Sequence, residues 1–179
     1  MTGDGRLRLF CALRLPEETL DTLVLWQARE LRDGRVVPRE NLHVTLAFLG
    51  SRPEADLPAI ADALAEAAAS AGRIELTAER YRETRSVGMV VLRDREGAGA
   101  ALADDLGVRL ERLGVYRREQ RPWLAHVTVL RYRQPPGLVL PVPELEPVVP
   151  SDAAVYISSL RPGGARYEVL ESVRLAGFI

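Results

Sequence analysis

Both histidines of this chain stand in the same short pattern, and this repeat limits the folds that the chain can adopt. The pattern is His43-Val-Thr-Leu46 in the first half and His126-Val-Thr-Val129 in the second. Alternate residues of a β-strand point to the same face of a sheet. Each pattern therefore predicts a strand with its histidine and threonine on a polar face and its aliphatic side chains on the core face. If the two halves are pseudo-symmetric, these strands can face each other across one cleft.

Further strands and helices are predicted around the two motifs. Pro16 and the apolar spacing after it indicate a helix that ends near Leu31. Other helices are predicted over 57–71 and 100–113, and strands over 6–15, 42–48 with Gly50 closing it, 74–78, 87–93, 125–132, 153–160 and 167–176. The six prolines from Pro135 to Pro150 indicate an ordered connector, because strands follow them. We expect two strand–helix–strand units within a single bilobal domain, residues 1–179.

The composition excludes several kinds of chemistry. All 24 side chains counted as Lys or Arg are arginine, so no lysine is present for a Schiff base, a P-loop or an adenylated intermediate of an ATP-dependent ligase. Cys11 is the single cysteine, which permits no internal disulfide and no Cys-rich metal site. Two histidines are also too few for a His-rich site. We therefore expect neither a metal nor a cofactor.

Charge and hydropathy predict an ordinary soluble protein. The chain is 47% hydrophobic and 27% charged, and its formal net charge of −1 provides no general basic field for nucleic acid. A contact with RNA would therefore depend on a local patch. The first residues lack the features of a signal peptide, and no apolar run is long enough to span a bilayer. A cytoplasmic protein with no membrane contact is the expectation.

Two imidazoles and two hydroxyls that converge on one cleft suit the hydrolysis of a cyclic phosphodiester. His43 and His126, with ordinary pKa values near 6.5, can supply a general acid and a general base. The hydroxyls of Thr45 and Thr128, with an arginine nearby, can hold the phosphoryl oxygens. A satisfied structural histidine is the simpler interpretation of one isolated motif. Repetition of the motif at every histidine of the chain favours the catalytic interpretation.

The segments that surround both motifs resemble the two-histidine phosphoesterase superfamily, specifically the LigT-like RNA 2′,3′-cyclic phosphodiesterases. The resemblance covers nearly the whole chain and is carried by residues 8–16, 38–50, 121–131, 159–160 and 164–167. It implies an α+β fold in which two pseudo-symmetric lobes of antiparallel sheet, with outer helices, enclose a central cleft. Ala125 departs from the family pattern, which often has proline before the second histidine. This change concerns the entry of the strand more than the chemistry.

The resemblance also implies a reaction, with RNA ends or nucleotides that carry a 2′,3′-cyclic phosphate as partners. The cyclic phosphate is hydrolysed to a 2′-phosphomonoester without ATP, and the protein is expected to be a monomer. The alternatives are ATP-independent 2′-5′ ligation of RNA, a phosphoesterase acting on another cyclic or 2′-5′-linked nucleotide, and binding of RNA ends without turnover. Both histidines argue against binding alone, because a binder requires no proton shuttle.

Individual roles follow from the same resemblance. His43 is expected to protonate the leaving O3′ and His126 to activate water. The side chains expected to bind the phosphate are Thr45, Thr128 and Arg131. Phe48 is expected to stack on the nucleobase.

Phe48 and Arg131 each lie five residues after a histidine, and strict alternation would place them on the opposite face from it. Each needs a bulge, a twist or a strand end to reach the cleft. Core packing for Phe48 and a surface salt bridge for Arg131 therefore stay open as alternatives.

Several other features have two interpretations. The arginines of 80–82 and 117–118, with Arg121, Arg131 and Arg133, could line an RNA groove or form a solvated surface. Gly97-Ala-Gly99 is expected to be a plain turn, and Cys11 a small buried residue. Trp123 either borders the cleft or packs in the core.

Overall fold

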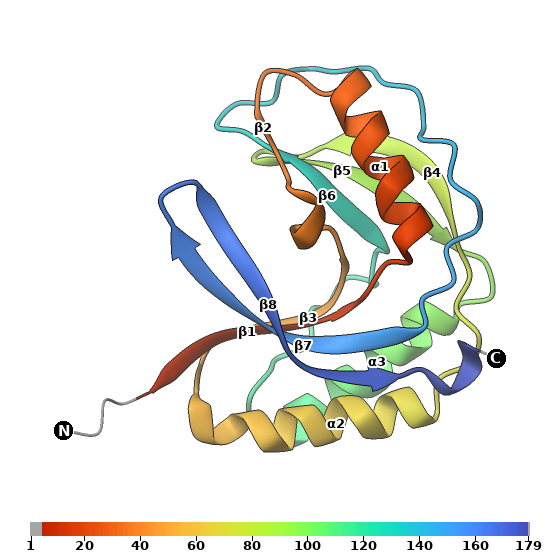
Figure 1. Ribbon diagram of the computed structural model, residues 1–179. Coiled ribbons are helices and arrows are strands. Elements are labelled where there is room, and N and C mark those ends of the chain that lie inside the picture. The colour runs from red at the N-terminus through yellow and green to blue at the C-terminus, as the bar shows by residue number, and fades with distance from the viewer. Residues whose placement is uncertain (1–4, 179) are drawn as a thin grey trace.

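The computed structural model describes residues 5–178 and contains two four-stranded antiparallel sheets (Figure 1). The first sheet has the strand order β3 (Val44–Pro53), β1 (Arg6–Leu13), β7 (Asp152–Arg161) and β8 (Gly164–Arg174). The second has the order β2 (Arg35–Val36), β6 (His126–Arg131), β5 (Val87–Asp94) and β4 (Leu76–Glu83). The helices are α1 (Glu17–Glu30), α2 (Leu57–Ala69) and α3 (Ala98–Arg112), with short 3-10 turns η1 (Arg39–Asn41), η2 (Glu54–Asp56) and η3 (Ala176–Phe178). The predicted fold class is confirmed.

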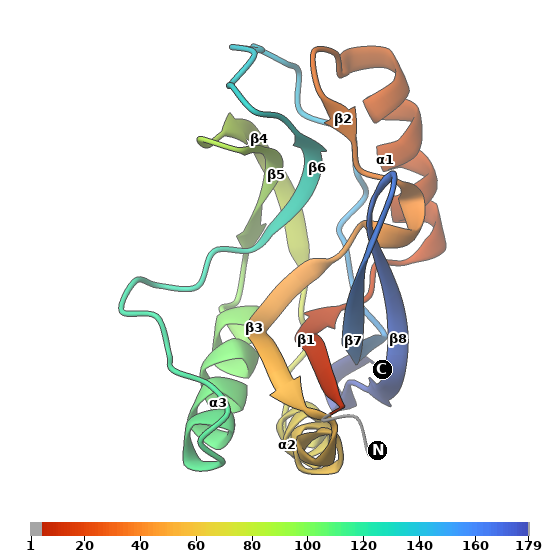
Figure 2. The same cartoon turned by 90° about the vertical axis from the view of Figure 1, so that its left-hand side faces the viewer.

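Two of the helices, α1 and α3, cross between the two sheets. α1 follows β1 of the first sheet but packs against the second, where the side-chain amide of Gln27 donates 3.0 Å hydrogen bonds to the carbonyls of Val37 and Val129. α3 follows β5 of the second sheet, yet it packs with α2 against the first (Figure 2). The two predicted strand–helix–strand units are present, because β1 and β3 on either side of α1 pair in one sheet and β5 and β6 on either side of α3 pair in the other. In both units the helix packs against the opposite sheet. Helical periodicity shows which face of a helix is buried but not which sheet covers it.

β3 is longer than the sequence predicts. It continues past Gly50, which was expected to close it, and ends at Pro53. Leu9 of β1 pairs with Gly50 and Phe10 pairs with Phe48, so Leu49 is an additional residue in the ladder. Gly50 has a φ of 68°, a conformation that glycine adopts without steric cost. The glycine therefore permits a β-bulge in place of a strand end.

The proline-rich connector is ordered, as predicted, and lies against the second sheet. Val148 and Leu76 exchange two backbone hydrogen bonds of 2.7 and 2.9 Å. The indole Nε1 of Trp26, on α1, donates to the carbonyl of Pro141 at 2.9 Å. One hydrophobic cluster includes buried residues of both sheets and of α1, α2 and α3. Within the described residues, none of the helices has the length and apolar character needed to cross a membrane.

Candidate active site

β3 contains a bulge directly after Thr45. Thr45 and Phe48 are three residues apart, whereas their partners on β1, Ala12 and Phe10, are only two apart. The additional residue is Leu46, and it reverses the alternation of faces. Because directly paired residues lie on the same face, Phe48 shares the face of Thr45. Its side chain is 50% exposed, which excludes the core-packing alternative.

β6 contains the equivalent bulge directly after Thr128. Thr128 and Arg131 are three residues apart, and their partners on β5, Met89 and Val87, are two apart, which leaves Val129 as the additional residue. Arg131 therefore shares the face of Thr128. Arg131 and Phe48 occupy equivalent positions in the two sheets, each five residues after a histidine and each redirected by a bulge.

The two imidazoles are held by equivalent hydrogen bonds. Nδ1 of His43 lies 2.8 Å from the carbonyl oxygen of Asn41, and Nδ1 of His126 lies 2.8 Å from that of Leu124. A carbonyl oxygen only accepts, so each Nδ1 carries the proton and donates it. This leaves Nε2 of both rings free for acid–base chemistry. Nε2 of His43 is 2.9 Å from the hydroxyl oxygen of Thr45.

Contacts between the lobes bring the two motifs together. β3 and β6 contact each other, and the indole Nε1 of Trp123 donates to the backbone carbonyl of Thr45 at 3.0 Å. Arg131 Nη2 donates to the hydroxyl of Tyr167 at 3.4 Å, and the ring of Tyr167 packs edge-on against His43 at 5.5 Å. Trp123 thus links the second motif to the first, and Arg131 reaches from the second sheet to the neighbourhood of His43.

An aromatic cage surrounds His43. Its ring centroid lies 4.9 Å from Phe10, 5.5 Å from Tyr167 and 6.0 Å from Tyr156. Phe10 and Tyr156 stack at 4.9 Å with almost parallel rings. The sequence interpretation gave these aromatic residues no role, because they come from β1, β7 and β8, which only the tertiary fold brings together.

The cage changes the acid–base behaviour of His43. Burial lowers the pKa of His43 from 6.5 to about 4. The hydrogen bond from Nδ1 to Asn41 raises the pKa, whereas the electrostatic influence of His126 and Arg131 lowers it further. His43 is therefore neutral near pH 7 in the folded protein, and its pKa responds to both His126 and Arg131.

Asn41 positions the cage and was missed in the sequence. Its side chain is buried, and Nδ2 donates to the carbonyl of Ala165 at 2.8 Å. Its Oδ1 accepts a hydrogen bond of 3.4 Å from the backbone N–H of Tyr167. Asn41 therefore fixes the start of β8 while its own carbonyl fixes His43. The sequence signal that could identify Asn41 is its position two residues before His43.

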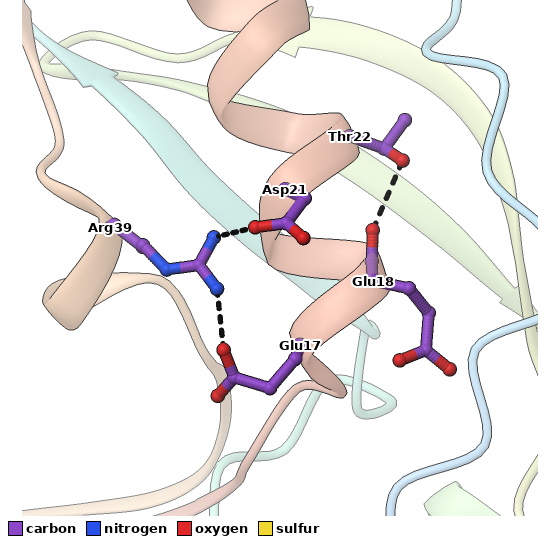
Figure 3. Close-up of polar contacts among 5 residues, drawn as sticks. All are labelled: Glu17, Glu18, Asp21, Thr22 and Arg39. Carbon is purple, nitrogen blue, oxygen red and sulfur yellow. Dashed lines mark hydrogen bonds and ion pairs between the residues drawn. The ribbon is translucent and has the colours of Figure 1, made fainter.

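Two other arginines, Arg39 and Arg118, are engaged by carboxylates. Arg39 of η1 donates to Asp21 at 2.6 Å and to Glu17 at 2.5 Å, which ties η1 to the first turns of α1 (Figure 3). Arg118 binds Asp104 and Glu111. Such exposed pairs contribute little to stability, but they occupy the guanidinium groups. For these arginines, neighbouring carboxylates take the place that a phosphate would need.

Two remaining features have structural explanations. Asp94 accepts hydrogen bonds from the backbone N–H groups of Gly99 and Ala100, so a carboxylate already caps this turn at the start of α3. Cys11 is fully buried, as predicted, and burial raises its pKa to about 12.

Among residues 5–178, no three His, Cys, Asp or Glu side chains gather as a metal-binding group.

The stability of the fold should fall as the pH decreases from about 6.5 to about 4. In this range the unfolded chain protonates His43, whose pKa is then 6.5, whereas the folded protein does not, because its pKa is about 4. Above pH 6.5 both states are neutral and the difference vanishes. The expected loss in the free energy of unfolding is up to about 3 kcal/mol, measured by urea denaturation across this pH range. His43→Gln should lose this dependence and His126→Gln should keep it; equal profiles for all three proteins would contradict the assignment.

Two antiparallel sheets, each with one His-x-Thr pair on the face shared with a redirected side chain, have the organisation of a two-histidine phosphoesterase. The model of the family "LigT like Phosphoesterase" matches residues 13–86. The RNA 2′,3′-cyclic phosphodiesterase of Thermus thermophilus is 36% identical over 96% of this chain and 91% of its own length. That of Escherichia coli is 31% identical over 92% and 94%. Escherichia coli LigT complexed with 3′-AMP superimposes with a TM-score of 0.81 at 27% identity, over 96% of this chain and 99% of its own. The protein belongs to the LigT-like phosphoesterase family.

Proposed function

We propose that this protein hydrolyses 2′,3′-cyclic phosphates on RNA ends or nucleotides to 2′-phosphomonoesters by metal-independent two-histidine catalysis. The observation that carries the proposal is the equivalent setting of His43 and His126, each with Nδ1 bound to a carbonyl and Nε2 left for chemistry. Both curated relatives bear the name RNA 2′,3′-cyclic phosphodiesterase, which supports the same substrate class.

In the proposed reaction, Nε2 of His126 accepts a proton from water while the water oxygen attacks phosphorus. The bond between phosphorus and O3′ breaks, and His43 donates its proton to O3′. Arg131 and the hydroxyls of Thr45 and Thr128 hold the phosphoryl oxygens as charge develops on them. Phe48 stacks on the base, with the guanidinium of Arg8 5.1 Å from its ring centroid. Proton exchange with solvent restores both histidines after each turnover.

His43 must carry a proton to act as the acid, although its pKa in the unliganded protein is about 4. The bound cyclic phosphate carries one negative charge, and an opposite charge close to an imidazole raises its pKa. The phosphate also offsets the positive charge of Arg131, which lowers the pKa of His43. We therefore expect His43 to take up its proton when the substrate binds.

The direct test is the incubation of 2′,3′-cyclic AMP with the protein in excess chelator, followed by phosphorus NMR. The expected product is the 2′-phosphomonoester, formed at an unchanged rate when the chelator is present. A 3′-phosphomonoester would show that the bond to O2′ breaks instead. Tight binding without turnover would replace the enzyme proposal with an RNA-end binder, and activity that requires an added divalent metal would overturn the metal-independent mechanism.

A further inference from the structure

A cavity of about 650 Å³ lies at the end of β6, next to Arg131. Arg35 and Arg133 also line it, so three arginine residues border the same space. A smaller cavity of about 60 Å³ is lined by Arg35 and Arg131 together with Asn41 and Tyr167, the residues that position and pack against His43. The arginine-lined cavity therefore adjoins the proposed catalytic cleft.

The three arginines have no carboxylate partner. Arg35 of β2 pairs directly with Arg131 of β6, so two like charges stand opposite each other on one face, which destabilises a sheet. Within residues 5–178, none of the three forms an ion pair. Asp33, the one acidic residue that lines the cavity, lies 3.8 Å from Arg32. The arrangement is therefore suited to bind an anionic ligand.

The position of Arg35 also connects the cavity to the first lobe. A Cβ atom at Gly164, at the tip of the β7–β8 hairpin, would lie only 2.7 Å from Arg35 Nη1, so the guanidinium rests against the hairpin backbone. Gly164 has a φ of 123°, which side-chain-bearing residues rarely adopt. The hairpin tip and β2 therefore both line the smaller cavity.

We propose that Arg35 and Arg133 bind the phosphodiester on the 5′ side of the terminal nucleotide, so that an RNA strand is preferred over a mononucleotide. This inference rests on the proposed function and adds a second phosphate subsite to it. Along β6, the residues that share one face of the strand are His126, Thr128 and Arg131, in that order. Arg131, which is proposed to bind the reacting phosphate, also lines the cavity. The volume of the cavity is in the range of ligand-binding pockets.

The test compares two substrates, 2′,3′-cyclic AMP and an RNA tetranucleotide that ends in a 2′,3′-cyclic phosphate. The wild-type protein should have a kcat/KM about tenfold higher for the tetranucleotide, since added phosphate contacts strengthen binding. Arg35→Gln/Arg133→Gln should lose this preference while its kcat/KM for 2′,3′-cyclic AMP changes by less than about twofold. Arg112→Gln/Arg174→Gln, which removes two exposed arginines elsewhere, is the matched control and should keep the preference.

Two results would overturn the subsite: a wild-type protein without preference for the tetranucleotide, or an equal loss on both substrates in the Arg35/Arg133 variant. If the wild-type protein hydrolyses neither substrate, the proposed function fails but the subsite is still testable. Fluorescence anisotropy with a labelled tetranucleotide ending in a 3′-phosphate then measures binding at several salt concentrations. The variant should reduce the slope of log K against log[salt] by about 0.7 for each RNA phosphate that it no longer binds. An unchanged slope would refute the subsite.

Discussion

Replacement of either His43 or His126 by alanine should lower kcat by about 10²- to 10⁴-fold, the usual contribution of one positioned acid or base. His126→Ala removes the group proposed to activate water, and His43→Ala removes the proton donor for O3′. Steady-state hydrolysis of 2′,3′-cyclic AMP measures the effect. The two effects should not add in the double variant, because the histidines act as one couple and either substitution alone disables it.

Binding and folding provide the controls for these variants. Both single variants should retain much of the affinity for 2′-AMP, since the proposed phosphate donors Thr45, Thr128 and Arg131 are still present. Their circular dichroism spectra near neutral pH should match that of the wild-type protein. A folded variant that keeps its activity to within about threefold would show that the missing histidine takes no part in proton transfer.

Arg131→Gln should reduce kcat/KM by about 10²-fold or more, because a charged donor to the phosphoryl oxygens is removed while the side chain stays polar. Arg131→Lys should recover part of this activity, since it restores the charge but not the planar, two-pronged guanidinium. The reduction should be similar for cyclic phosphates of all four bases, measured with each in turn.

Phe48→Leu is the matched control for the arginine, because Phe48 occupies the equivalent position in the other lobe. Loss of stacking should raise KM, most for purines, and leave kcat largely unchanged. If Arg131→Gln instead raised KM alone and differed strongly between bases, Arg131 would be assigned to base recognition and not to the reacting phosphate.

The features that the sequence predicted correctly depend on local patterns. The strands at both His-x-Thr motifs follow from a period of two residues, and the helices follow from apolar spacing and flanking glycine or proline. The need for a bulge, a twist or a strand end before Phe48 and Arg131 could also be inferred, because strict alternation would turn both side chains away from the cleft. The positions of the additional residues, Leu46 and Val129, could not be inferred, since they depend on the register with the neighbouring strand.

The missed features depend on contacts between distant segments. The cage that lowers the pKa of His43 combines side chains from β1, β7 and β8, and no pattern within one strand indicates it. β2 has two residues, too few for any periodicity, so the pairing of Arg35 with Arg131 was not predictable. The exchange of α1 and α3 between the sheets is likewise a property of the whole chain.

That exchange has a mechanical consequence. α1 leaves the first sheet and packs against the second, α3 leaves the second sheet and packs against the first, and one hydrophobic cluster contains side chains of both sheets and all three helices. Separation of the sheets would expose part of this cluster to water, which is unfavourable. The shared core therefore favours one fixed arrangement of the two His-x-Thr motifs. In such a preorganised site the hydrogen-bond donors are oriented before the substrate binds, so little of the binding energy is needed for a conformational change.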